Sequence, residues 1–197
     1  GYTVPITSEV SDFVFTNMNE SQRSKVWAVV NGQYNEVWWF YPSSSSTEID
    51  SYVAYNFENG TWTVGTLART AGVDAGSFQN PIWASTDHYI YEHETGFNYD
   101  SQVPFAESGA LQIGDGERLM NVQELIPDEK TLGQTTVQFK TANYPTGTET
   151  TSGVFSMANP TSVRISARQV RLRIAGNELA DWRYGNLRLD VSPGGRR

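Results

Sequence analysis

The stretch NEVWWFYPSSSSTEIDSYVAYNFENGTWTVG, residues 35–65, decides the fold. Residues 37–41 are β-branched or aromatic, and such residues suit a pleated, half-buried surface, so a strand is expected there. Pro42 and the four serines after it favour turns and end this strand. Residues 52–57 and 61–64 read as two more strands. The stretch therefore predicts antiparallel sheet.

The Asn59-Gly60 pair indicates a tight hairpin between the last two runs. A type I′ turn needs positive φ at both central residues, and Asn-Gly is the preferred pair for it. A two-residue loop would place Phe57 opposite Trp62. The sequence therefore predicts an aromatic pair packed across these two strands.

Residues 25–64 hold four short strands in this interpretation, because residues 25–30 form another run rich in valine and tryptophan. Four such strands have the size of one β-propeller blade, and they also fit a plain antiparallel meander. Residues 12–15 are expected to form a short strand before this region. A helical turn that ends at Arg23 follows it.

The region after the meander is less regular. Residues 66–80 read as a loop, and residues 81–94 read as a second hairpin around Ser85-Thr86-Asp87. Residues 1–100 would then hold about two propeller blades, whereas a closed ring needs at least four. If these are blades, the ring cannot close within this chain.

Composition excludes several classes of protein. The chain of 197 residues contains no cysteine, so disulfides and thiolate metal sites are excluded. No apolar run is long enough for a transmembrane helix, and we expect no membrane contact. The first residues lack the pattern of a signal peptide. Gly1 in place of Met indicates a fragment or a processed chain.

The net charge of −8 is unevenly distributed. Residues 1–100 carry 3 Lys and Arg against 12 Asp and Glu, a net charge of −9. Residues 101–197 carry 11 against 10, a net charge of +1. This asymmetry indicates two domains, 1–100 and 101–197, with the boundary near residues 100–108.

The second domain is expected to be a β-sandwich, because it holds six to eight short strands and no sustained helix. The predicted strands cover residues 110–113, 117–126, 135–141, 154–157, 163–174 and 187–191. Within residues 163–174 the apolar positions change parity between Ala167 and Val170. A strand that changes parity predicts a β-bulge at Arg168-Gln169.

Catalytic and metal-binding patterns are weak. His88 and His93 are the only histidines, and with Glu92 or Glu94 they could form a zinc site. Alternation along the strand points His93 and Glu92 to opposite faces, which argues against such a site. The acids that could serve a glycoside hydrolase are Asp87, Glu92, Glu94 and Asp100. We expect no catalytic residue, no metal and no cofactor.

Aromatic side chains offer a candidate binding surface. The set consists of Trp27, Trp38, Trp39, Tyr41, Trp62 and Trp83. An exposed row of such rings would suit a sugar, which keeps a carbohydrate-binding module open as an alternative. Trp38 and Trp39 are adjacent and face opposite sides of a strand, so at least one belongs to a core or an interface. Trp38, Trp39 and Tyr41 are our first interface candidates.

Arginines near the end of the chain form a second set: Arg164, Arg168, Arg171 and Arg173. These side chains could contact the phosphate backbone of a nucleic acid. They could instead line an outer strand face that pairs with acids of a neighbour. The acidic first half supplies such acids, within this chain or in an adjacent subunit. We favour the second interpretation and count these arginines as interface candidates.

Four motifs resemble the C-terminal part of large virion structural proteins of tailed bacteriophages. They are EVWWFYPS at residues 36–43, YEHETG at 91–96, Glu117-Arg118 before the Ile-Pro-Asp turn, and RLDVSPGGRR at 188–197. The sequence looks like the tail tubular, nozzle or packaged-DNA-stabilisation class, which bears β-propellers. The resemblance covers most of residues 20–197, and none of its motifs is catalytic.

The resemblance implies a non-enzymatic part of the virion, assembled as a ring at the tail or the head–tail connector. The expected partners are other copies of the chain and other tail or portal proteins, and DNA contact stays open. The protein would be made in the bacterial cytoplasm and end in the virion. A longer protein with an N-terminal part would then contain this chain. The expected fold class is all-β, with propeller-blade-like sheets followed by a β-sandwich.

Overall fold

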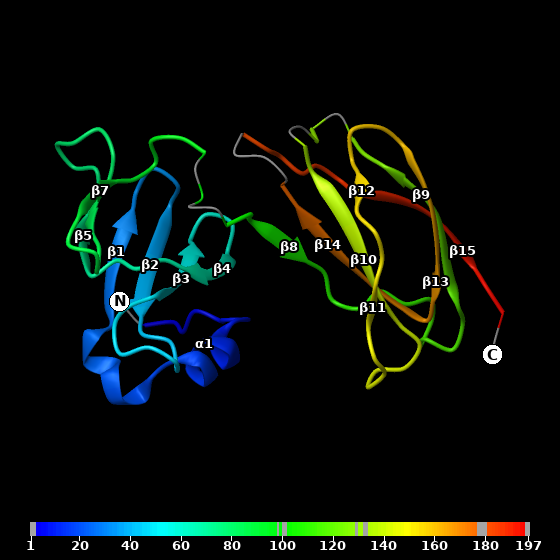
Figure 1. Ribbon diagram of the computed structural model, residues 1–197, viewed down its shortest axis with the longest axis horizontal. Coiled ribbons are helices and arrows are strands. Elements are labelled where there is room, and N and C mark those ends of the chain that lie inside the picture. Colours follow the sequence, from blue (N-terminus) through cyan, green and yellow to red (C-terminus); the bar gives the residue numbers. More distant parts are fainter. Residues whose placement is uncertain are drawn as a thin grey trace. The chain divides into compact units, whose positions relative to one another are not determined.

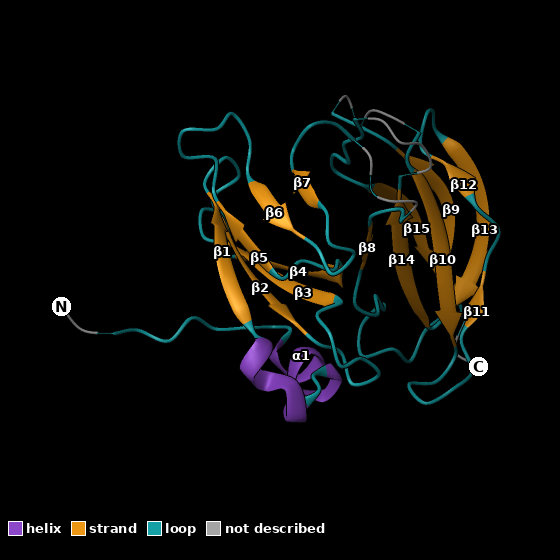
Figure 2. Ribbon diagram, turned by 60° about the vertical axis from the view of Figure 1, so that its left-hand side comes forward, coloured by secondary structure: helices purple, strands orange, loops and turns teal. Residues whose placement is uncertain are grey.

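The computed structural model describes residues 3–97, 99, 102–128, 130–131, 134–176 and 181–195. Antiparallel strands dominate this part of the chain, so the all-β prediction is confirmed (Figures 1 and 2). The chain divides into two compact units, unit 1 (Gly1–Gly96) and unit 2 (Phe97–Arg197), and each contains its own hydrophobic core. The division falls a few residues before the region where the charge asymmetry placed it.

Unit 1 begins with two short helices and continues as strands. Its elements are α1 (Ser11–Asn17), the 3₁₀ helix η1 (Glu20–Lys25), β1 (Trp27–Asn31), β2 (Glu36–Tyr41), β3 (Ser51–Asn56), β4 (Thr61–Thr66), β5 (Ala71–Val73), β6 (Ile82–Ala84) and β7 (Ile90–Glu92). Strands β1 to β4 form an antiparallel meander in sequence order. The meander is therefore observed, while its membership of a propeller blade stays a prediction.

The hairpin between β3 and β4 differs from the prediction in its register. Tyr55, not Phe57, lies opposite Trp62, and four residues rather than two form the loop. The side chain of Asn56 accepts hydrogen bonds from the backbone N–H groups of Glu58 and Asn59, which lengthens the turn. Gly60 has a φ of 70°, but Asn59 is not among the residues with positive φ, as a type I′ turn would require.

Strands β5, β6 and β7 form a second sheet of unit 1, with β6 in the middle. The β6–β7 hairpin was predicted, whereas β5 lies in a segment that we expected to be a loop. Three residues are too few to show a strand period in the sequence. Trp83 of β6 is 1% exposed and packs edge-on against Phe40 of β2, with ring centroids 5.5 Å apart. The two sheets of unit 1 therefore share one core.

The N-terminal prediction needs correction. Residues 12–15 lie in helix α1 rather than in a strand, because apolar residues recur at the helical spacing Val10, Val14 and Met18. The expected helical turn near Arg23 exists as η1. Asn19 caps it, and its side-chain oxygen accepts a hydrogen bond from the backbone N–H of Ser21.

Unit 2 contains two groups of paired strands. Its strands are β8 (Phe105–Glu107), β9 (Met120–Ile126), β10 (Thr136–Ala142), β11 (Thr150–Thr151), β12 (Phe155–Ser156), β13 (Thr161–Ala167), β14 (Gln169–Ala175) and β15 (Arg188–Pro193). One sheet has the order β11-β10-β14-β8, with β12 also paired to β10. The other has the order β13-β9-β15. Residues 110–113, expected as a strand, make only an isolated bridge between Leu111 and Val170.

The parity change at Arg168 has a different cause from the one predicted. It is not a bulge within one strand, because β13 pairs with β9 in one sheet and β14 pairs with β10 in the other. The chain passes from sheet to sheet at this residue. Ala167 and Val170 still both reach the core, since each sheet turns its own apolar face inward.

The core of unit 2 lies between its two sheets and draws on both. Its buried members include Val122 and Leu125 from β9, Phe139 from β10 and Leu172 from β14. Residues 135–141 were predicted to alternate with Val137 and Phe139 on one face, and both of these side chains are fully buried. Two sheets around one core are what a β-sandwich requires. The assignment of unit 2 to the β-sandwich fold stays a prediction.

Candidate interaction surface

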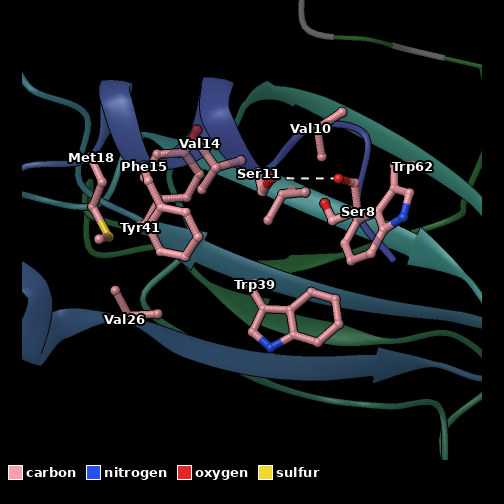
Figure 3. A pocket seen from close by; sticks show the side chains of 11 residues that line it. Ser8, Val10, Ser11, Val14, Phe15, Met18, Val26, Trp39, Tyr41 and Trp62 are labelled. Carbon is pink, nitrogen blue, oxygen red and sulfur yellow. Dashed lines mark hydrogen bonds between the residues drawn. The ribbon is translucent and has the colours of Figure 1, made fainter. Parts of the chain in front are cut away.

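An apolar groove of about 270 Å³ lies between helix α1 and the β1–β4 sheet of unit 1 (Figure 3). The helical side contributes Val10, Val14, Phe15 and Met18, and the sheet side contributes Trp39, Tyr41, Val53 and Trp62. Apart from Ser8 and Ser11, the lining side chains are apolar or aromatic. Such a surface can bury apolar groups of a partner, but it lacks the ionisable side chains that acid–base catalysis would need.

Alternation along β2 builds the sheet side of the groove. Trp38 and Phe40 point into the core of unit 1, so Trp39 and Tyr41 point to the opposite face. Trp62 joins them from β4, with its ring centroid 6.1 Å from that of Trp39. One sheet thus carries aromatic rings on both faces. One face is covered by the β5–β7 sheet, and the other is covered only in part by α1.

Helix α1 is a weakly held cover for this groove. It has seven residues, no side-chain N-cap and no buried residue, and a helix this short gains little stability on its own. The loop of four serines holds the end of the helix. Met18 forms a β-bridge with Ser43, and the side-chain amide of Asn19 donates to the carbonyl oxygen of Ser46 over 2.8 Å.

The serine loop itself is ordered by an acid that sequence reasoning missed. Asp50 accepts hydrogen bonds from the backbone N–H and the hydroxyl of Ser43, over 2.7 and 2.6 Å. Ser43 is buried, although the sequence suggested an exposed turn. An Asp seven residues after a serine is no recognised motif, so only the fold shows this contact.

The rim of the groove leaves apolar side chains in water. Phe15 lines the groove and is nevertheless 65% exposed, and Val26, which also lines it, is exposed as well. Phe13 on the same helix is exposed as well. Contiguous apolar surface of this kind commonly marks the site of an interaction with another protein.

Strand β7 is a second exposed apolar feature of unit 1. Ile90 is 73% exposed, and Tyr89 beside it is also exposed. β7 ends the order β5-β6-β7, and no described strand pairs with its outer edge. An apolar edge strand can pair with another chain. Because the β5–β7 sheet packs on the Trp38 face of the meander, β7 and the groove lie on opposite sides of that meander.

The structure separates the three aromatic interface candidates. Trp38 packs inside unit 1, stacked on Tyr52 at 4.4 Å, and its indole N–H donates to Glu36. Trp39 lines the groove and is half-buried. Tyr41 also lines the groove, but at 2% exposure it forms the floor. Trp39 is therefore the candidate that can touch a partner most directly.

The aromatic set proposed as a sugar platform does not share one surface. Trp27 and Trp38 pack against the core of unit 1, and Trp83 belongs to that core. Trp39 and Trp62 face the groove instead. Alternation along the strands explains the split.

Arg171 and Arg173 pair with acids, as favoured from the sequence, but these acids belong to unit 2. Arg171 Nε lies 3.3 Å from Glu149 Oε1, and Arg173 lies 3.5 Å from Glu107 Oε2. Lys140 also bonds Glu107 over 2.6 Å, and this contact, with the arginine, holds the pKa of the Glu107 carboxyl below its ordinary value. For these two arginines the acidic first half is not the partner described by the structure.

Arg164 and Arg168 do not share a strand face. Arg164 is exposed on β13, while Arg168 occupies the corner between the two sheets. The guanidinium of Arg168 lies 5.5 Å from the ring centroid of Tyr144. Arg168 and Tyr144 line an open hollow of about 310 Å³ together with Leu119, Asn143 and Ser166, and Arg164 does not line it.

A polar cluster at one end of the unit 1 sheet was not found from the sequence. Asn31 ends β1, lies opposite Glu36 in the strand register and donates from Nδ2 to Oε1 of Glu94 over 2.9 Å. Burial raises the pKa of Glu36 and that of Glu94, and the charge of Glu36 raises the pKa of Glu94 further. These residues are up to 63 positions apart and form no motif.

The residues weighed for zinc and for glycoside hydrolysis have other partners. His93 Nε2 accepts a hydrogen bond from Arg69, and Glu92 accepts one from Asn80. Asp87 accepts one from the hydroxyl of Tyr91. Asp100 lies outside the described residues. In the described part of the chain, no group of three or more His, Cys, Asp or Glu side chains is arranged to hold a metal ion.

Neither a protein-family model nor a curated protein matches the chain. Among the residues with described positions, no helix has the length and apolar character needed to cross a membrane.

Proposed function

We propose that this chain is a non-enzymatic structural and assembly component of a tailed-bacteriophage virion, at the tail or the head–tail connector. The four motifs that resemble the C-terminal part of such proteins support the virion assignment. The apolar groove of unit 1 is the single observation that carries the assembly role. Its partners are other copies of the chain and other tail or portal proteins.

The contact between copies is a head-to-tail one in this proposal. The groove beside α1 receives the exposed strand β7 of the next copy. The groove and β7 lie on opposite sides of the meander, and two different surfaces in contact make a heterologous interface. Such an interface generates a ring when its rotation closes. Burying a side chain such as Phe15 or Ile90 stabilises the contact by roughly 1.5–3 kcal/mol.

Light scattering on variants tests the contact. Phe15→Asp removes the groove rim and Ile90→Asp removes the apolar strand, so each variant alone should be smaller than the wild-type assembly. An equimolar mixture should form dimers, because the Ile90→Asp copy keeps its groove and the Phe15→Asp copy keeps its β7. Phe78→Asp is the control, since Phe78 is equally exposed in unit 1 but does not line the groove.

A wild-type chain that stays monomeric at high concentration, alone and with virion proteins, would contradict the proposal. Circular dichroism of each variant checks that the fold is intact. Mass spectrometry of purified tailed particles tests the virion assignment separately from the contact between copies.

A further inference from the structure

We propose that Asn31, Glu36 and Glu94 form a binding site for an oxygen-ligated divalent cation of the calcium type at the end of the unit 1 sheet. This site uses no residue that lines the groove and no residue of β7 itself. It lies on the core face of the β1–β4 sheet, opposite the face that carries the groove.

The strand register brings two of the three side chains together. Asn31 and Glu36 are direct partners in the β1–β2 pair, and the next partners along the same face are Val29 and Trp38. Directly opposite residues of an antiparallel pair have Cβ atoms about 4.5–5.5 Å apart. Their side chains therefore point to the same side of the sheet and lie close to each other.

Glu94 completes the set from the loop after β7. Its carboxylate accepts a hydrogen bond from the Asn31 amide nitrogen over 2.9 Å. Its backbone has a φ of 60°, in the left-handed region that a glutamate seldom adopts. The fold thus holds Glu94 in an unfavourable backbone conformation while its carboxylate contacts Asn31.

The amide oxygen of Asn31 is the observation that points to a ligand. The side chain is fully buried, and its Oδ1 has no hydrogen-bond partner among the residues that the structure describes, although its Nδ2 donates to Glu94. A buried acceptor without a donor costs about 1–3 kcal/mol. A cation could be ligated by this oxygen and both carboxylates together, whereas a water molecule has two hydrogens and could donate to only two of the three groups.

The chemistry of the three side chains selects the class of cation. Carboxylate and amide oxygens are the ligands of Ca²⁺, which takes six to eight oxygens in flexible geometry. Water would supply the ligands beyond those of the protein. Asp74 adds negative charge nearby, since its carboxylate accepts the backbone N–H of Gly32 next to Asn31. Burial and the Glu36 charge raise the pKa of Glu94, and a bound cation would lower it.

The test uses Ca²⁺ and Tb³⁺ on the full chain. In excess Ca²⁺ the unfolding midpoint of unit 1 should rise by about 5 °C relative to chelator. Tb³⁺ should emit on tryptophan excitation, because Trp38 donates a hydrogen bond to Glu36 and so lies beside the site. Added Ca²⁺ should displace the Tb³⁺ ion and so reduce this emission.

Glu36→Gln and Glu94→Gln are the decisive variants. In chelator each should be at least as stable as the wild type, because each removes a half-buried negative charge whose pKa burial raises. This separates loss of the site from loss of the fold. Neither variant should be more stable in Ca²⁺ than in chelator. The Tb³⁺ emission of each should be at least tenfold below that of the wild type. Glu92→Gln is the matched control, since Glu92 is exposed two residues away and should keep both responses.

Two results would overturn the proposal. One is a wild-type chain whose unfolding midpoint does not change with Ca²⁺ and which gives no sensitised Tb³⁺ emission. A wild-type chain that is stabilised by acid but not by Ca²⁺ counts as the same result. The other is an equal Ca²⁺ shift in the wild type and both glutamine variants, which would place the cation elsewhere.

Discussion

The core of unit 1 is built around a few large aromatic rings, whereas the core of unit 2 draws mainly aliphatic side chains from two sheets. Phe40 and Trp83 form the centre of the first, and five of the six tryptophans lie in unit 1. Unit 1 also leaves phenylalanines exposed on α1, while the charged groups on β14 in unit 2 pair with neighbouring acids.

The largest expected effect is in the core of unit 2. Phe139→Ala removes a fully buried ring that packs edge-on against Phe155 at 5.7 Å. The free energy of unfolding of unit 2 should fall by about 3–5 kcal/mol, because apolar burial is lost and a cavity is left behind. Hydrogen exchange followed by mass spectrometry should show it in unit 2, while unit 1 keeps its protection.

Val154→Ala is the control for this substitution, because Val154 is exposed in the same unit. If Phe139→Ala weakened protection equally in both units, the two cores would not be separate in the way described here.

A smaller loss is expected from crowding in unit 1. A Cβ atom added at Gly72 would overlap Cδ1 of Trp83, a ring too well buried to move aside. Gly72→Ala should therefore cost about 1–3 kcal/mol. Urea denaturation followed by tryptophan fluorescence reports this change, since most tryptophans are in unit 1. Gly96→Ala has open space around it and should behave as the wild type.

Glu94 in unit 1 and Asp128 in unit 2 should respond to acid in opposite directions. Burial raises the pKa of Glu94 in unit 1, so its folded form binds the proton more readily and stability rises as pH falls through that pKa. The backbone N–H of Asn186 lowers the pKa of Asp128 in unit 2, with help from Thr131, so stability is lost as pH falls through that lowered pKa.

Hydrogen exchange in chelator across a pH series measures both responses. Glu94→Gln should remove the rise in stability that unit 1 shows as the pH falls. Asp128→Asn should lower protection of unit 2 at neutral pH, and its difference from the wild type should close below roughly pH 4. If the two substitutions changed the acid response of their units in the same direction, the comparison would be wrong.

The smallest expected effect is on the outer face of unit 2. Arg171 and Glu149 form an ion pair in which both side chains are at least 40% exposed. Exposed pairs contribute little, so Arg171→Ala should change the free energy of unfolding by no more than about 0.5 kcal/mol. A loss above about 1 kcal/mol in urea denaturation would show that this face is more than a solvated surface.

Local patterns were enough to predict the strands whose side chains alternate. Val137 and Phe139 were expected to face one way, and both are buried. The alternation of Trp38 and Trp39 was also visible, because it depends only on the strand period. These features need no knowledge of which strand lies next door.

Features that depend on distant partners could not be predicted. The loop before Trp62 has four residues instead of the predicted two, because the side chain of Asn56 accepts hydrogen bonds from the loop backbone. The Asn-Gly pair alone does not predict this contact. The parity change near Val170 fits both a bulge and a change of sheet, and only the pairing of β13 and β14 separates the two. Asn31 and Glu94 meet through the fold alone.

Only one residue, Arg168, joins β13 to β14. The number of residues at this corner therefore matters more than which side chain stands there. A different side chain at this half-exposed position leaves both strands in place. An added or deleted residue would shift one strand by one step and turn Val170 and Leu172 toward water. Insertions should therefore be tolerated in the loop at residues 144–149 and rejected here.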